Sequence, residues 1–113
     1  MSEKKSYIIL CAAGDMALGG SLEGAFETSG SAGELAAQIS PLFTESDIGF
    51  SNLDCTFDTT GEPPRPDEYL VHATPGQLDI LKELGIDIVS QANNHSLDFG
   101  GEGLVRTQRH LEA

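Results

Sequence analysis

Three clusters of polar side chains in the sequence could carry chemistry. The first is Asp15 after Gly14, the second is Asn52 with Asp54, and the third is the run Asn93-Asn94-His95. Each cluster follows a short apolar run, with 37 residues from Asp15 to Asn52 and 42 from Asn52 to Asn94. These intervals suit one strand-helix-strand crossover each. Because ligands bind outside the carboxyl ends of the strands in open α/β sheets, we expect the clusters to gather at one edge.

The side chains in these clusters are hard oxygen donors together with one imidazole. That donor set suits Mn²⁺, Mg²⁺, Fe or Zn²⁺, and metal-assisted hydrolysis is the chemistry it favours. Each residue also has an ordinary structural interpretation. Asp15 and Asp54 could cap turns, Asn52 could bond loop amides, Asn93-Asn94 could be turn asparagines, and His95 could be structural. Their coincidence at three strand ends favours the functional interpretation.

Three short apolar runs are the strands that would position these clusters. They span Tyr7–Ala13, Asp47–Leu53 and Ile86–Gln91. The first is almost continuously apolar, which is typical of a strand buried on both faces. The other two alternate more.

The first helix is expected to begin at Ser31, because Ser31 and Glu34 have the spacing of a capping box. Leu35, Ala36 and Ile39 follow at helical spacing, and Pro41 should end or kink this helix.

Two further helices are expected later in the chain. Thr74-Pro75-Gly76-Gln77 starts the second with proline at its first position, and Gly85 is a suitable C-cap. The third spans about Gly101–Glu112. The residues expected to face inward are Leu78, Leu81 and Leu84 in the second helix, and Leu104, Val105, Gln108 and Leu111 in the third.

The resulting order predicts an α/β protein, a βαβαβα open parallel sheet with flanking helices. The proline-rich segment Thr59–Asp67 reads as an exposed loop. Cys11 and Cys55 are expected to be small buried or loop residues rather than a redox pair, since the sequence holds no CxxC motif.

Composition excludes several classes of protein. The 113 residues carry a formal net charge of −12, which disfavours nucleic acid as a partner and suits divalent cations or basic partners. Two cysteines cannot form the disulfide framework of a small secreted fold. No apolar run approaches the roughly 20 residues of a membrane span, and as written the chain reads as cytoplasmic.

The chemistry-bearing strings resemble a known family. They are Gly14-Asp15-Met16, Ser51-Asn52-Leu53-Asp54, Ala92-Asn93-Asn94-His95-Ser96-Leu97-Asp98-Phe99-Gly100, Gly103-Leu104 and Thr107. Together they resemble the CapA/PgsA family of poly-γ-glutamate capsule proteins, within the calcineurin-like metallophosphoesterase superfamily. The resemblance runs from about residue 7 to the last residue. It implies the first half of a four-layer αββα sandwich, so that residues 1–113 would be a single domain of this fold, shortened at its carboxyl end.

The resemblance also implies a site for two divalent metal ions. Asp15, Asn52, Asp54 and Asn94 would be metal ligands, and His95 would contact the substrate oxyanion or protonate the leaving group. Asp54 stands where the family has glutamate, which shortens its reach by one methylene. The family's later histidine motifs are absent, so the metal site is incomplete in this chain.

Three other residues near the motifs are expected to play no part in metal binding. His72 and His110 do not match the family's later histidines and are expected at the surface. Asp98 is expected to brace the turn into the last helix.

Two classes of function follow from the resemblance. The favoured one is a metal-dependent hydrolase related to capsule synthesis, acting on an anionic polymer or a phosphoester. The alternative is a non-catalytic polymer-binding or accessory protein of the cell envelope, or an inactive fragment. The chain is also expected to expose an apolar face, and so to form homo-oligomers or associate with a missing carboxyl-terminal half.

Overall fold

A parallel sheet is the frame of the molecule, which we describe from a computed structural model covering residues 4–19, 31–57 and 70–113. Within these residues the sheet has three strands in the order β1-β2-β3: β1 (Leu10–Met16), β2 (Ile48–Leu53) and β3 (Ile88–Ser90). The helical elements are α2 (Ser31–Thr44), the short 3₁₀ helix η2 (Pro75–Gln77), α3 (Leu78–Leu84) and α4 (Gly100–Glu112). The predicted α/β fold with a βαβαβα order and an open parallel sheet is therefore confirmed. The predicted loop Thr59–Asp67 lies outside the described residues.

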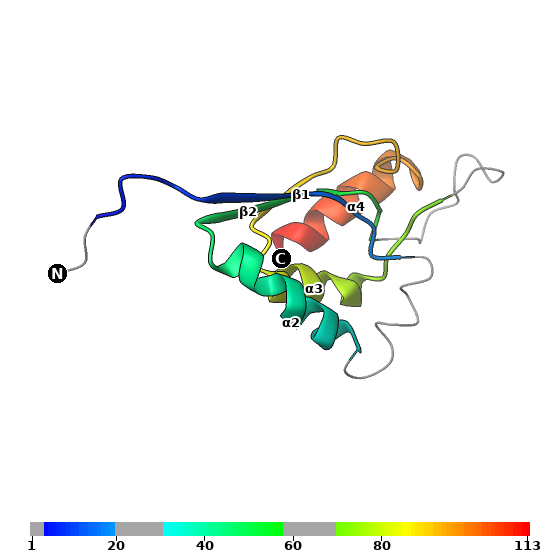
Figure 1. Cartoon of the computed structure of the whole chain (residues 1–113). Coiled ribbons are helices and arrows are strands. Elements are labelled where there is room, and N and C mark those ends of the chain that lie inside the picture. Colours follow the sequence, from blue (N-terminus) through cyan, green and yellow to red (C-terminus); the bar gives the residue numbers. More distant parts are fainter. Residues whose placement is uncertain (1–3, 20–30, 58–69) are drawn as a thin grey trace.

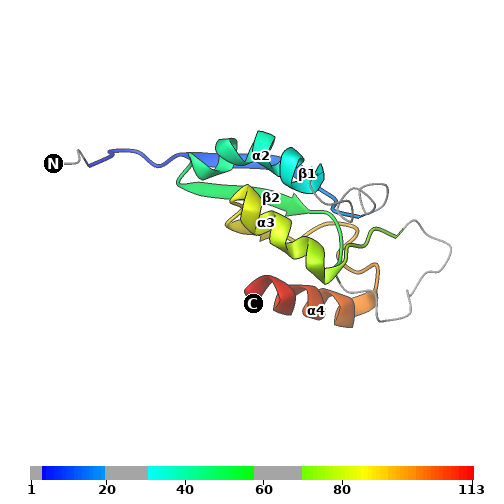
Figure 2. The same ribbon diagram turned by 90° about the horizontal axis from the view of Figure 1, so that it is seen from below.

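Among the described residues, the helices leave one face of the sheet open. Helices α2 and α3 lie on the same side of the strands (Figure 1), and α4 lies beyond α3, so that the three helices run side by side in Figure 2. The burial of β2 alternates accordingly: Gly49, Ser51 and Leu53 are buried on the helix side. Ile48, Phe50 and Asn52 are only partly buried and belong to the opposite face.

The expectation that the first strand is buried on both faces is wrong. The strand begins at Leu10 rather than Tyr7, and most of its residues are exposed. Leu10 is 60% exposed and its neighbour Ile8, before the strand, is 75% exposed. The reason lies in the topology: β1 is an edge strand, and the described helices cover only one side of it. Apolar composition gives a strand's tendency to be buried, but burial requires a second layer on the open face.

The core lies between the carboxyl half of the sheet and helix α3. Its buried members are Leu18, Leu53, Cys55, Phe57, Ala73 and Leu81. Both cysteines are free, with Cys11 half-buried and Cys55 buried. Burial raises the pKa of the Cys55 thiol, which disfavours its reactive thiolate. Within the described part of the chain, no helix has the length and apolar character needed to cross a membrane.

Helix α2 does not stop at Pro41. It continues to Thr44, where a further turn forms because the Glu45 amide donates to the Pro41 carbonyl at 3.1 Å. A proline removes one amide donor, but residues on its carboxyl side can still bond to its carbonyl. The predicted inner residue Ala36 is buried, whereas Ile39 is 36% exposed. Helix α2 begins at Ser31 as expected, although the Ser31 side chain lies outside what the structure describes.

Helix α3 follows its sequence signals closely. The Gln77 Oε1 accepts the Thr74 amide at 2.6 Å, which is the reciprocal half of the expected capping box, and η2 leads into the helix. Gly85 ends the helix with φ of 82°, a left-handed conformation that glycine adopts without strain. Leu81 and Leu84 are buried as expected.

The predicted inner face of α4 is right in part: Leu104 and Leu111 are partly buried, and Leu111 packs against the core. Val105 and Gln108 are exposed, and the buried residues are Gly103 and Thr107. Thr107 Oγ1 accepts the Phe57 amide at 3.2 Å and lies 2.8 Å from the Gly103 carbonyl. A hydroxyl that satisfies a buried amide draws the small-residue face of the helix inward. Apolar periodicity alone does not show such a contact.

Two aspartates fix the strand register at the amino edge of the sheet. Asp47 Oδ2 accepts the Ile9 amide at 2.8 Å, while the Asp47 amide donates to the Ile9 carbonyl at 2.8 Å. Asp87 repeats this ring with Gly49, at 2.7 Å and 2.9 Å. Each aspartate stands immediately before a strand and is followed by isoleucine. The repeated Asp-Ile pair therefore ties β2 to the residue before β1, and β3 to β2.

Gly49 lies close against Gly85 and Phe43 of the helical layer, and replacing it by alanine should destabilise the fold. A Cβ at this position would lie 2.5 Å from the Gly85 carbonyl oxygen and 3.2 Å from the Phe43 ring. We expect Gly49→Ala to lower the free energy of unfolding by about 1–3 kcal/mol, measured by urea denaturation. Gly14→Ala is the matched control, since a Cβ there meets nothing within 4 Å. Equal stability of the two variants would contradict this packing.

Asp47 should make the stability depend on pH in the acid range. Its pKa is lowered from the ordinary 3.8, chiefly because its carboxylate accepts the Ile9 amide, with a further contribution from Lys5. A lowered folded-state pKa adds stability above the unfolded value, and this stability is lost as the pH falls through the folded value. Asp47→Asn should therefore flatten the loss of stability below about pH 4. Asp79→Asn, on exposed α3 surface, should leave the profile steep; identical profiles for both variants would refute the assignment.

Candidate metal site at the carboxyl edge of the sheet

A bulge in β1 decides which face of the sheet carries Asp15. Ala12 pairs with Phe50, but the next recorded pair is Asp15 with Asn52, so β1 contains one extra residue between these pairs. Without it, Asp15 would pair with Leu53 and fall on the helix side. The bulge instead places Asp15 beside Asn52 on the open face and returns Met16 to Leu53 on the core side. Ser51, fully buried, holds the bulge by donating its hydroxyl to the Gly14 carbonyl at 2.9 Å.

Asn52 links the ends of the first two strands. Its Nδ2 donates to Asp15 Oδ1 at 2.8 Å. Its Oδ1 accepts from Asn93 Nδ2 at 3.0 Å, so the chain of bonds continues into the loop after β3. The predicted convergence of the three clusters at one edge is therefore present for Asp15, Asn52 and the loop that carries His95.

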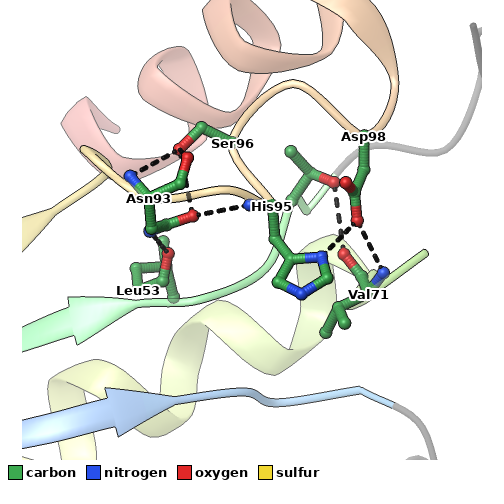
Figure 3. Close-up of polar contacts among 7 residues, drawn as sticks. Leu53, Val71, Asn93, His95, Ser96 and Asp98 are labelled. Atoms are coloured by element: carbon green, nitrogen blue, oxygen red, sulfur yellow. Dashed lines mark hydrogen bonds and ion pairs between the residues drawn. The ribbon is translucent and has the colours of Figure 1, made fainter. Parts of the chain in front are cut away.

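Asn93 organises the third cluster. Its Nδ2 also donates to the Leu53 carbonyl at 2.8 Å, and its Oδ1 accepts the His95 amide at 3.0 Å (Figure 3). An asparagine that accepts the amide two residues later forms an Asx turn. One side chain therefore joins the carboxyl end of β2 to the loop after β3 and also shapes that loop.

Ser96 closes the same turn from the other side. Its hydroxyl lies against the Gln91 carbonyl and 3.1 Å from the Asn93 carbonyl, and the Asn93 amide donates to its oxygen at 3.4 Å. Ser96 is buried. The loop that presents His95 is thus fixed by side chains within it as well as by the sheet.

His95 lies beside a buried carboxylate. Its Nδ1 is 2.7 Å from Asp98 Oδ2, and the same oxygen accepts the Val71 amide at 2.8 Å (Figure 3). The side chain of Asp98 is 5% exposed and that of His95 is 17% exposed. Asp98 thereby braces the turn into α4, as the sequence suggested.

The other two predicted ligands stand apart from this network. Asn94 is exposed and Asp54 partly buried, and neither side chain forms a hydrogen bond to the described part of the chain. The Asp54 amide donates to the Met16 carbonyl at 3.0 Å, which keeps Asp54 at the same strand end. Within the described ranges, therefore, the side-chain oxygens of Asp54 and Asn94 take no part in the network.

The donor set fits part of a metal site. Asp15 carries a second carboxylate oxygen beyond the one bonded to Asn52, and Asn52 Oδ1 retains a lone pair. Among residues 4–19, 31–57 and 70–113, however, no three His, Cys, Asp or Glu side chains group as a metal site would require. The metal roles of Asp15, Asn52, Asp54 and Asn94 remain predictions.

His72 is not the plain surface residue that was expected. It is partly buried and packs edge-on against Phe99, with ring centroids 6.1 Å apart and an interplanar angle of 86°. It also pairs with Thr56 in an isolated parallel bridge, so its backbone is held close to the end of β2. His110 is partly buried near the end of α4.

Sequence reasoning missed the residue that organises the site. It treated Asn93 and Asn94 as a pair and assigned the metal to Asn94, whereas Asn93 makes the contacts. The spacing of Asn93 to His95 and to Ser96 fits an Asx turn closed by a serine, and this local pattern was the available signal. The role of Ser51 had no such signal, because it depends on the bulge in another strand.

Comparison with known proteins identifies the family. The sequence profile of the bacterial capsule synthesis protein family, PGA_cap, matches residues 9–113. This match covers nearly the whole chain, and the chain belongs to this family. The resemblance drawn from the motifs to the CapA/PgsA family is confirmed.

Two curated relatives come from Sinorhizobium fredii, the uncharacterized proteins y4sH and y4uA. Each is 33% identical to the chain over 82 residues, which make up 67% of this chain and 18% of the relative. The chain therefore spans less than a fifth of the length of these relatives.

The network predicts different outcomes for the two adjacent asparagines. Asn93→Ala leaves the Leu53 carbonyl and the His95 amide without their partner, which should lower the free energy of unfolding by about 1–3 kcal/mol. Asn94→Ala, the matched control, should change it by no more than about 0.5 kcal/mol because Asn94 is exposed. Chemical denaturation measures both; a larger loss for Asn94→Ala would reverse the assignment.

Proposed function

We propose that the protein is a metal-dependent hydrolase of capsule synthesis, acting on an anionic polymer such as poly-γ-glutamate or on a phosphoester. The observation that supports it is the bulge-directed pairing of Asp15 with Asn52 at the strand ends, on the face opposite to helices α2 and α3. Open α/β sheets bind ligands at this edge. The family membership supports the link to capsules.

In this proposal the four oxygen donors hold two divalent ions. Asp15 and Asn52 contribute from adjacent strands, and Asp54 and Asn94 contribute side chains that no internal hydrogen bond occupies. Bound metal would supply an activated water for attack. Further anionic ligands would have to come from outside the described residues, since these hold no group of three acidic, histidine or cysteine side chains.

The residues of the chain itself would orient and protonate the substrate. The Asn93 turn fixes the backbone of His95, and Asp98 fixes its ring, so that the imidazole is held at the strand edge. From there His95 would contact the substrate oxyanion or donate a proton to the leaving group. A net charge of −12 repels an anionic polymer, and bound cations would offset this repulsion.

A non-catalytic role in the cell envelope is the second candidate. The lack of three clustered metal-binding side chains in the described residues favours it. In that role the same edge and the exposed apolar face would bind polymer or another protein. Association through this face, whether with a second copy or with further chain, is supported by the exposure of Leu10 at 60% and Ile88 at 52%.

Hydrolysis by the full-length protein tests the proposal. The protein is purified without chelator, its metal content is measured by elemental analysis, and its rate on a model phosphodiester is recorded. Asp15→Asn and His95→Ala should each abolish hydrolysis and retain the circular dichroism spectrum, and Asp15→Asn should also lower the metal content. Asp79→Asn, which changes the same charge on α3, should do neither. Unchanged rates in both site variants would refute the roles assigned to Asp15 and His95, and metal-free inactive protein would favour the envelope role.

A further inference from the structure

The carboxylate of Asp98 is buried, which is unusual for a side chain that can carry a charge. It lies in the loop that leads to α4, its side chain is 5% exposed, and its Oδ2 receives both the His95 ring and the Val71 amide. A buried carboxylate is costly unless hydrogen bonds compensate it. A neutral acceptor at this position would need only the hydrogen bond from the Val71 amide. The second contact, between Asp98 and the His95 ring, therefore calls for a separate explanation.

The geometry fixes which nitrogen of His95 carries the proton when the ring is neutral. His95 Nδ1 lies 2.7 Å from Asp98 Oδ2. An ionised carboxylate only accepts hydrogen bonds, so beside an ionised Asp98 the Nδ1 nitrogen would be the donor. Nε2 then has a free lone pair and, in Figure 3, points away from Asp98. The Asp98 contact therefore sets both the tautomer and the orientation of the imidazole.

Asp98 is itself held from two directions. The Val71 amide fixes it from the segment that follows β2, where Thr56 and Val71 are joined by a backbone bond of 3.2 Å. Its own amide donates to the His95 carbonyl at 3.2 Å, which closes the turn between the two residues. These contacts restrict the position of the Asp98 carboxylate. The orientation of the His95 ring is therefore set by the carboxylate.

We propose that Asp98 is a positioning residue that holds His95 as the Nδ1-protonated tautomer, with Nε2 directed to the substrate. The effect on turnover rests on the proposed hydrolase function, whereas the tautomer itself does not. Asp98 would act only through His95 and would contact neither metal nor substrate. When the ring is doubly protonated, Nε2 is the nitrogen that delivers the proton to a leaving group.

Nitrogen-15 NMR of the histidine rings tests the tautomer directly. In mildly alkaline solution the wild-type protein should show His95 with a protonated Nδ1 and a bare Nε2. Asp98→Asn should allow the other tautomer to appear, because an amide oxygen at the Oδ2 position is a weaker acceptor for Nδ1–H than a carboxylate oxygen. Asn keeps an oxygen for the Val71 amide, so the fold should persist.

Asp87→Asn is the matched control. Asp87 Oδ2 also accepts a backbone amide, that of Gly49 at 2.7 Å, but it lies at the opposite edge of the sheet from His95. Its variant should leave the His95 signals unchanged. A wild-type ring protonated on Nε2, or an unaltered tautomer in Asp98→Asn, would overturn the proposal; the wild-type spectrum decides even if a variant fails to fold.

Turnover by the full-length protein separates this inference from the proposed function. Asp98→Asn should lower kcat by roughly 10²-fold with little change in KM, because it disturbs proton transfer rather than binding. An active wild type whose kcat is unchanged in Asp98→Asn would overturn the positioning role. A wild-type protein without hydrolytic activity would refute the proposed hydrolase function. The tautomer of His95 would still be tested by the NMR experiment alone.

Discussion

A single extra residue in β1 is the constraint on which the proposed site depends. Side chains alternate across a strand, so one inserted residue moves everything after it to the other face. The bulge before Asp15 turns this carboxylate away from the helices and beside Asn52, and it returns Met16 to the core. The bond from Ser51 to the Gly14 carbonyl holds the bulge from a fully buried position. A buried contact on the helix side of the sheet thus determines which side chains lie on the opposite face.

A series of hydrogen bonds starts at Asp15 and continues along the carboxyl edge of the sheet. Asp15 bonds to Asn52, Asn52 to Asn93, and Asn93 to the backbone of His95. Three segments far apart in sequence are thereby fixed relative to one another. The two adjacent asparagines differ in their contacts. The Asn93 side chain forms hydrogen bonds within the protein, whereas Asn94 is exposed and its side chain forms none with the described residues. Side chains held in place by such internal hydrogen bonds lose less freedom when a ligand binds to them.

The sequence allowed prediction of those features that depend on local signals. The order of strands and helices along the chain, the start of α2, the Gly85 cap and the meeting of the polar clusters all follow from spacing and residue type. Other features depend on partners distant in sequence. The exposure of Leu10 depends on how many layers cover the sheet, the inward face of α4 depends on the Phe57 amide that Thr107 accepts, and the direction of Asp15 depends on Ser51. Helix α2 passes Pro41 because the turn beyond it bonds to the proline carbonyl.

The central claim is that the bulge places Asp15 and Asn52 to bind a divalent cation at the carboxyl edge of the sheet. Crystals of the full-length protein soaked in Mn²⁺ and measured at the manganese absorption edge test it most directly. The account predicts an anomalous peak about 2.0–2.4 Å from a carboxylate oxygen of Asp15, with Asn52 or Asn94 among its neighbours. A fully occupied manganese peak elsewhere, with Asp15 still bonded only to Asn52, would contradict it.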